Sequence, residues 1–578
     1  MVEHKIIAAP PKPRPVPPTP PRSAPASRVR RLARLFRTLR HLSVGQVFWR
    51  VRYRFPVREV AWRDAARRAV SGAWCEPVVR QPCVDSAQAV ATHLNAARPV
   101  SSPACWNDAS APKLWLYHLH YFEDLAGLHR RDGTDAALRW VRRWIGENPH
   151  PRGNGWEPYP ASRRVVAWIK AALGGLPLDD AILRSLARQV ARVQARLEYH
   201  LLANHLFVNA KALVFAGAFF AGRDADRCLA RGVEVLRREL DEQVLDDGGH
   251  FERSAMYHAS FVEDVLDLIG LCRAYRDVAA LSLLEPVLLE RAVSMLDWLV
   301  AMLCPDGGYP RFNDCTNGEA PAAGELLAYA ARLGVAPSAP KARAAEHLRS
   351  SGFARATVGG WTVLADVGTP GPSYQPGHAH AGTLSIDLYD GDRCVVCGSG
   401  VSTYEIGEVR DFERSTMARW AIGLDGADSS EVWAGFRVGR RARVHDASVE
   451  AREGACTVQA WHDGYRYLRG SPRVSRRVEL SSDGVVVADG VHGGARHAVS
   501  ARVTLHPDIS VVELAPSRAV LRHADGTVYA LDAEPPVDFV REVGWLAPEF
   551  GIRRPRDVLA WTIDAPLPVT VRTRITRC

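Results

Sequence analysis

Residues 246–258 carry an unusual density of side chains that exchange protons or hold charge. His250, Glu252, Arg253 and Tyr257 follow a pair of glycines, and an apolar helical pattern begins directly after them. A core helix has little use for such a start, because each buried polar group must find a partner. Arg253 and Tyr257 are four residues apart, which would place them on one helix face. We therefore interpret this segment as part of a catalytic groove.

Asn204 and His205 stand at the head of a second helical pattern, residues 205–220. Apolar residues cover nearly all faces of this pattern, which indicates an inner helix. A lone histidine at such a place is most often a cap or a satisfied core residue. The adjacent asparagine adds donors and an acceptor, so the pair could also hold a carboxylate.

Two aromatic clusters precede further helical patterns. One contains His120 and Tyr121, and the other contains Trp156 and Tyr159. Aromatic rings stack on sugar faces in binding clefts, but they also pack the loops of large helical domains. The residues alone do not decide between these two roles.

His378 and His380 enter a predicted strand, where alternation places both on one face. The pair could hold a metal, but a third ligand would have to come from elsewhere. Asn313 and Asp314 close the helical part of the chain. A cleft between two domains is the usual place for such separated clusters to meet.

The order of these patterns predicts an all-α domain followed by an all-β domain. Residues 110–350 show apolar residues at helical spacing with short loops, and such helix pairs can close into a ring. Residues 351–578 alternate and carry Asp-Gly turns, which is typical of an antiparallel sandwich. Residues 28–109 are predicted as a basic N-terminal helical segment, and residues 1–27 as a disordered proline-rich tail.

The chain carries 74 Lys and Arg against 64 Asp and Glu, a formal net charge of +10. This charge suits nucleic acid, an anionic glycan or anionic lipid, and does not choose among them. Arginines alternate with apolar residues between Arg28 and Arg40, so this stretch could lie on an anionic membrane or dock on its own domain. No apolar run approaches the ~18–20 residues of a membrane span. Scattered cysteines, including the pair Cys394 and Cys397, indicate no disulfide framework.

In their order and spacing, these motifs resemble the heparinase II/III-like family, many of whose members are polysaccharide lyases, including heparan sulfate and alginate lyases. The resemblance covers about residues 110 to 510 and rests on the runs Asn204–Leu213, Asp247–His258, Phe312–Asp314, Gly377–Ala381, Arg410–Thr416, Ser430–Trp433 and His462–Tyr465. It implies an incomplete (α/α) toroid followed by an antiparallel β-sandwich.

The resemblance implies β-elimination at a uronic acid, in which the C5 proton is lost and the C4–O bond breaks. Tyr257 and His378 match the family's catalytic pair, and Asn204 and His205 would neutralise the substrate carboxylate. Arg253 would support Tyr257 as a phenolate, because an ordinary phenol has a pKa of about 10. The expected substrate contacts are Arg253, Trp156, Tyr159, His120, Tyr121, His250, Glu252, Asn313 and Arg419.

Many relatives also bind a structural zinc ion in the sandwich. Here its ligands would fall at His380, at an aspartate near Gly398, and at a histidine position that holds Arg419. Two of these three ligands are missing, so we expect no cofactor, with Arg419 in place of the cation.

We therefore expect a lyase acting on a uronate-containing anionic polysaccharide, with no nucleic acid partner. A non-catalytic glycan-binding or polysaccharide-export protein of the same fold is the alternative. A glycoside hydrolase would need two opposed carboxylates, and nothing in the sequence pairs Glu157, Asp247 and Glu252. The family implies the cell envelope or periplasm. Residues 1–27 show no recognisable signal segment, which makes the cytoplasm the alternative.

Overall fold

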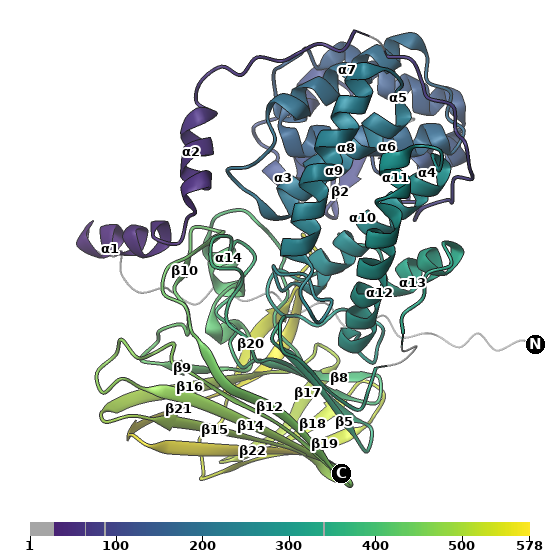
Figure 1. The fold of residues 1–578 in the computed structure, drawn as a ribbon. Helices are drawn as coiled ribbons and strands as arrows, with labels where there is room; N and C mark the ends of the chain where they lie inside the picture. Colours follow the sequence, from purple (N-terminus) through teal and green to yellow (C-terminus); the bar gives the residue numbers. More distant parts are fainter. Residues whose placement is uncertain (1–27, 64, 86–87, 339–341) are drawn as a thin grey trace, which may run out of the picture.

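The computed structural model describes residues 28–578 except 64, 86–87 and 339–341. The disordered tail predicted for residues 1–27 lies outside the described residues. Helices dominate the first half of the described chain and strands the second (Figure 1). The predicted order of an α-domain followed by an antiparallel β-domain is therefore confirmed.

The helical domain is built from helices whose apolar faces share one core. Its members are α3 (Lys113–Tyr121), α4 (Leu125–Asp132), α5 (Thr134–Glu147), α6 (Pro158–Leu173), α7 (Asp180–Ala195), α8 (Ala203–Phe219), α9 (Arg223–Gln243), α10 (Ala255–Ala274), α11 (Ala279–Ser282), α12 (Glu285–Met302) and α13 (Ala323–Arg332). Nearly every residue of α8 is buried, as expected of an inner helix. Helices α6, α7, α9 and α10 all pack against it.

The segment before this domain is less helical than predicted. Among the described residues before α3, the helices are α1 (Arg28–Leu39) and α2 (Val44–Arg52), with a short 3-10 turn. Residues 84–99 instead contain an antiparallel sheet of β1 (Val84–Asp85), β2 (Val90–His93) and β3 (Ala96–Pro99). Leu94 and Asn95 take positive φ values of 53° and 59°, which closes the tight turn between β2 and β3.

The β-domain contains three larger antiparallel sheets. The first has the order β4-β5-β6-β7-β8, the second β12-β13-β14-β15-β22-β19-β18-β17, and the third β20-β21-β16-β9. Strand β5 contacts β13 and β14, so the first sheet packs on the second. Alternation buries Val474, Val478 and Leu480 of β14 in their shared core.

The strands of these sheets are β4 (Ala345–Leu348), β5 (Phe353–Val358), β6 (Trp361–Asp366), β7 (Ile386–Asp390), β8 (Arg393–Val396), β9 (Ile422–Leu424), β12 (Val444–Arg452), β13 (Ala455–His462), β14 (Arg473–Ser481), β15 (Gly484–His492), β16 (Arg496–Thr504), β17 (Ile509–Ala515), β18 (Arg518–His523), β19 (Val528–Glu534), β20 (Val540–Leu546), β21 (Arg554–Pro566) and β22 (Val569–Arg577). A short hairpin of β10 (Val432–Trp433) and β11 (Arg437–Val438) and the helix α14 (Glu408–Glu413) lie between β8 and β12 in the chain. These connecting elements reach toward the helical domain (Figure 1).

The carboxylate of Asp314 ties the two domains together. It follows α12 in the chain and accepts two hydrogen bonds from Arg410 of α14, one of them at 2.7 Å. The same carboxylate lies 2.9 Å from Nδ1 of His378 and 2.7 Å from Nε2 of His380. Burial alone would raise the pKa of Asp314, but Arg410 and the two histidines hold it well below its ordinary value. Asp314 is therefore an anion that joins three side chains of the β-domain to the helical domain.

Gly217 of α8 allows a close approach to α9. A Cβ atom at Gly217 would lie 2.5 Å from the backbone nitrogen of Leu229. We predict that Gly217→Ala lowers the free energy of unfolding by about 1–3 kcal/mol, because overpacking outweighs the gain in helix propensity. Gly146→Ala in α5 meets nothing within 4 Å and should not be destabilising. Urea unfolding of both variants tests this, and equal free energies would contradict the close approach.

Removing the charge of Asp314 should destabilise the protein strongly. We predict that Asp314→Asn lowers the free energy of unfolding by about 3–5 kcal/mol, because buried Arg410 loses its counter-charge. The contribution of the carboxylate is present above its unfolded pKa and is lost as pH falls through its lower folded pKa, so the two proteins converge in acid.

The matched control is Asp532→Asn, which breaks an exposed pair with Arg518 at 3.1 Å. It should change the free energy of unfolding by no more than about 0.5 kcal/mol. Equal losses in the two variants would show that Asp314 has no special role.

Candidate functional site

Helices α6, α8 and α10 begin side by side. Near the start of α6, the ring of Tyr159 has its centroid 4.4 Å from that of His205 in α8. At the start of α8, Nδ2 of Asn204 donates to Oε1 of Glu252, just before α10, at 2.8 Å. Three polar helix starts therefore meet at one place, which we call the groove after the catalytic groove that the sequence predicts.

Strained backbone leads into two of these helices. Leu202, the residue before α8, and Ala203, its first residue, have φ values of 62° and 54°, and Arg253 has a φ of 59° before α10. Such left-handed conformations are costly for residues other than glycine and persist where the surrounding structure enforces them. Ser254 then caps α10 by accepting the backbone N–H of Tyr257. The cap fixes the first turn of α10, and with it the position of Tyr257.

His205 lies beside a carboxylate in this groove. Its Nδ1 lies 3.2 Å from Oε1 of Glu198, and its side chain is 29% exposed. Burial lowers the pKa of His205, but Glu198, followed by Glu252 and Glu157, raises it above the ordinary value overall. The imidazolium form therefore persists to higher pH than in an ordinary histidine, and Nε2 is the ring nitrogen that does not face Glu198.

Tyr257, His378 and Tyr404 form a group of neighbouring polar rings. The ring centroids of Tyr257 and His378 are 3.9 Å apart, and the hydroxyls of Tyr257 and Tyr404 are 3.2 Å apart. Nε2 of His378 lies 3.2 Å from Oε2 of Glu252, while its Nδ1 faces Asp314. Burial and then Tyr404 raise the pKa of Tyr257 well above its ordinary value, so this phenol keeps its proton at neutral pH.

The structure thus brings together Asn204, His205, Tyr257 and His378, with Tyr159 and Glu252 beside them. The role predicted for Arg253 is wrong. Its side chain points into the domain interface, where Nη2 donates to the carbonyl of Gly352 at 3.0 Å and pairs with Asp366 at 3.1 Å. The helical spacing to Tyr257 does not apply, because the left-handed residue Arg253 lies before α10 begins.

Three other predicted substrate contacts, His120, Trp156 and His250, are also wrong, because all three side chains are buried with partners inside the fold. Nε2 of His120 donates to the carbonyl of Trp106 and Trp156 donates to Asn148. Nε2 of His250 lies 3.1 Å from Gln243. The aromatic clusters around His120 and Trp156 serve loop packing, the second of the two roles that the sequence left open.

Tyr121 and Asn313 lie behind the groove and do not line it, since both are buried. The ring of Tyr121 has its centroid 6.0 Å from that of Tyr159. Asn313 has a φ of 56°, donates to the carbonyl of Arg253 at 2.7 Å and accepts from the backbone N–H of His380 at 3.0 Å. Both residues therefore support their neighbours instead of contacting substrate.

The residues around His380 do not fit a zinc site. Nε2 of His380 faces Asp314, and Nδ1 accepts a hydrogen bond from Nη2 of Arg419 at 2.9 Å. Arg419 is buried, which lowers its pKa to about 10 and leaves it charged at neutral pH. A guanidinium thus lies against one ring nitrogen of His380 and a carboxylate against the other. The predicted contact of Arg419 with substrate is wrong, because its side chain is buried beside His380. The described ranges contain no group of three or more His, Cys, Asp or Glu that could hold a metal ion.

Sequence reasoning missed Tyr404 and Glu198. Tyr404 lies in the irregular segment before α14, where no periodicity marks its side chain. Glu198 lies in the turn between α7 and α8. The one signal in the sequence is that a carboxylate stands a few residues before Asn204 and His205. Arg410 belongs to a run that resembles the family but had no assigned role.

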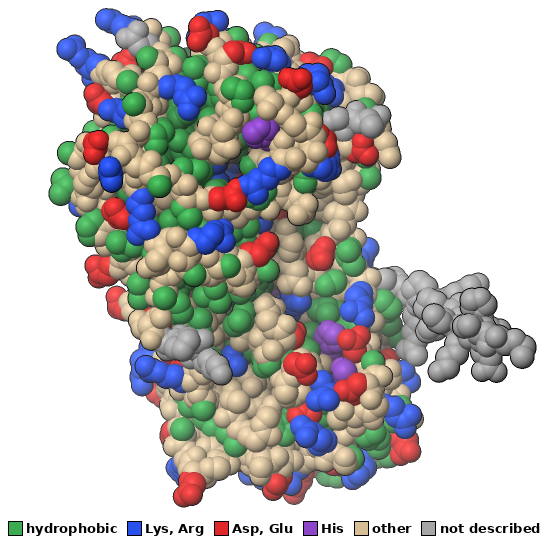
Figure 2. Space-filling view, turned by 90° about the vertical axis from the view of Figure 1, so that its right-hand side faces the viewer, with side chains coloured by type: hydrophobic (Ala, Val, Ile, Leu, Met, Phe, Trp, Pro, Cys, Tyr) green, Lys and Arg blue, Asp and Glu red, His purple; other side chains and the backbone are tan. Residues whose placement is uncertain are grey.

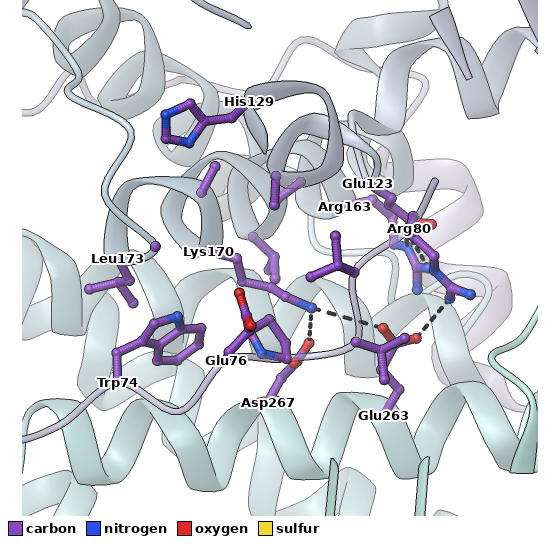
Figure 3. A pocket seen from close by; sticks show the side chains of 18 of the residues that line it. Trp74, Glu76, Arg80, Glu123, His129, Arg163, Lys170, Leu173, Glu263 and Asp267 are labelled. Carbon is purple, nitrogen blue, oxygen red and sulfur yellow. Dashed lines mark hydrogen bonds and ion pairs between the residues drawn. The ribbon is translucent and has the colours of Figure 1, made fainter. Parts of the chain in front are cut away.

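A cavity of about 630 Å³ lies farther along the same inner helices (Figure 3). Its charged side chains satisfy one another: Lys170 pairs with Asp267 at 2.7 Å, and Arg80 with Glu263 at 2.8 Å. Asp267 lies ten residues beyond Tyr257 on α10, about three turns away. We therefore place the chemistry at the groove and interpret this cavity as part of the ion network inside the helical domain.

Residues 111–332 match the heparinase II/III N-terminus, and residues 340–574 match the heparinase II/III-like C-terminal domain. FtsZ-localized protein C of Caulobacter vibrioides is 27% identical over 376 residues, which span 63% of this chain and 62% of that protein. A heparin-sulfate lyase of Bacteroides stercoris is 23% identical over 194 residues, which span 28% of this chain and 29% of the lyase. The matched regions therefore span less than two thirds of either relative.

The fold is similar to the crystal structure of heparinase III, with a TM-score of 0.66 at 16% identity over 81% of this chain and 78% of that chain. A mutant of a heparan sulfate lyase from Pedobacter heparinus gives a TM-score of 0.60 at 16% identity, over 92% of this chain and 87% of that chain. At these identities the likeness is one of fold. With both family regions matched in order across its two domains, the chain belongs to the heparinase II/III-like family.

Proposed function

We propose that this protein is a polysaccharide lyase that cleaves a uronate-containing anionic polysaccharide by β-elimination. The observation that carries the proposal is the pairing, in one groove, of a protonated phenol at Tyr257 with an imidazole at His378 that is held between two carboxylates. The imidazole of His205 and the carboxamide of Asn204 lie at the start of α8, where Asn204 contacts Glu252.

Each step of the elimination has a side chain suited to it. His205 and Asn204 bind the uronate carboxylate and stabilise the extra negative charge that develops there. Nε2 of His378 takes the C5 proton, and Asp314 and Glu252 stabilise the imidazolium that forms. The C4–O bond breaks as Tyr257 gives its proton to the departing oxygen, and the hydroxyl of Tyr404 stabilises the phenolate left behind.

A non-catalytic glycan-binding protein is the second candidate. One observation favours it: the carboxylate of Glu252 lies against both Asn204 and His378, where it competes with a substrate carboxylate. FtsZ-localized protein C, a relative covering much of this chain, carries a name that states its location and no reaction.

A glycoside hydrolase is disfavoured. Glu157 accepts from Lys113 and Tyr117, while Asp247 accepts from the backbone and hydroxyl of Ser351 at the domain interface. Hydrolysis needs two carboxylates facing each other across a sugar ring, and these carboxylates are committed to separate partners.

A lyase assay tests the proposed role of Tyr257. We predict ultraviolet absorbance of unsaturated uronate products from at least one of alginate, heparan sulfate, hyaluronan and the host's own polymer. Tyr257→Phe should lower kcat by about 100-fold or more, because the departing oxygen loses its acid. Tyr467→Phe, at a tyrosine of the β-domain that is 42% exposed, is the matched control and should retain full activity.

Retained activity in Tyr257→Phe would show that another group is the acid. Binding of these polymers without any absorbance would replace the lyase with the glycan-binding protein. New reducing ends without absorbance would indicate a hydrolase.

The pH dependence of the reaction should report on His205. Because its pKa is raised, the imidazolium persists to higher pH, and kcat/KM should fall as pH rises through that pKa. Glu198→Gln removes the main cause of the raised pKa, so the falling limb should move to lower pH. A profile of kcat/KM against pH for both proteins measures this, and an unmoved limb would contradict the role of His205 as a cation.

A further inference from the structure

Helices α1 and α2 present an apolar face to the outside. Leu32, Phe36 and Leu39 follow helical spacing along α1 and are 67%, 70% and 49% exposed. On α2, the exposed apolar residues at the same kind of spacing are Val44, Val47, Phe48 and Val51. Large apolar side chains exposed together in this way are characteristic of interaction surfaces.

The opposite faces of the two helices are attached to the protein. Arg37 of α1 donates to Glu431 at 2.6 Å and 2.9 Å, and Thr38 accepts from the indole of Trp433 at 3.1 Å. On α2, the ring of Trp49 stacks on that of Tyr199 at 5.0 Å. We call α1 and α2 together, residues 28–52, the arm. The polar and aromatic face of the arm anchors it to both domains, and its apolar face points outward.

Arginines border this outward face. Arg31, Arg40, Arg50 and Arg54 are all exposed. The arm stands at the left of Figure 1, away from the face in Figure 2, where basic and acidic side chains are interspersed. Helices that combine exposed Leu and Phe with bordering arginines bind anionic lipid surfaces, because apolar burial and charge attraction act together. No helix of the described chain is long and apolar enough to cross a bilayer.

We propose that the outward face of α1 and α2 docks the protein on an anionic phospholipid membrane. The positive charge of the arginines favours a membrane over a second copy of this chain. The arginines repel the same arm of a second copy and attract acidic lipid head groups. Tyr53, directly after α2, donates to the carbonyl of Leu197, the neighbour of Glu198. Docking through the arm therefore holds the groove close to the membrane surface, whatever reaction it performs.

Vesicle flotation tests the proposal with the full chain. The protein should float with vesicles of phosphatidylcholine and phosphatidylglycerol, and much less with phosphatidylcholine alone. Phe36→Ser combined with Phe48→Ser should lower the partition coefficient by about tenfold or more, because two large apolar side chains no longer enter the lipid. Arg31→Glu combined with Arg40→Glu should lower the partition coefficient by a comparable factor. High salt should lower binding of the parent protein in the same way, because it screens the attraction to acidic lipids.

Val540→Ser combined with Val543→Ser is the matched control, since these exposed residues lie on β20 of the sandwich, and it should bind as the parent does. Circular dichroism checks that each variant is folded. Equal binding to neutral and acidic vesicles, or unchanged flotation of the Phe36/Phe48 variant, would overturn the proposal. A dimer that the same variant converts to a monomer, without vesicle binding, would also overturn it in favour of a second copy.

Discussion

The site depends on one buried ion pair, between Asp314 of the helical domain and Arg410 of the β-domain. The carboxylate of Asp314 contacts Nδ1 of His378 and the guanidinium of Arg410, so it helps to set the position of His378 relative to Tyr257. A charge buried between domains is stable only when its partners are complete. Asp314 has three, and each is a side chain of the β-domain. The contacts that position His378 in the groove therefore also hold the two domains together.

Burial and neighbouring carboxylates shift the pKa values of two groups in the groove. Tyr257 keeps its proton because burial disfavours the phenolate and the cation expected nearby, Arg253, points elsewhere. The pKa of His205 is raised because Glu198 outweighs the same burial. The groove thus combines a proton donor with an imidazole whose positive form persists to higher pH, and elimination beside a carboxylate requires such a donor and such a charge. Glu252 adds a negative charge that a substrate would have to accommodate.

Periodicity was sufficient to predict the order of the domains and the inner helix α8, because burial follows regular spacing. Asn204, His205 and Tyr257 could be predicted because each stands at the start of a helix. His378 and His380 were expected to enter a strand, but they lie in the irregular segment before β7, so only their place in a motif could mark them. Arg253 was misplaced because a left-handed residue interrupts the helical spacing, and no sequence pattern marks that conformation. Tyr404 lies in an irregular segment, so only the tertiary fold brings its hydroxyl to Tyr257. The strands β1–β3 are too short for alternation to distinguish them.

Whether the oxygen of water enters the products distinguishes the proposed elimination from hydrolysis most directly. Products formed in water enriched in heavy oxygen can be weighed by mass spectrometry. The elimination proposed here predicts fragments whose masses sum to that of the parent polymer, with a double bond in the new terminal sugar and no heavy oxygen. Fragments that together have gained a water molecule, labelled with heavy oxygen, would contradict it.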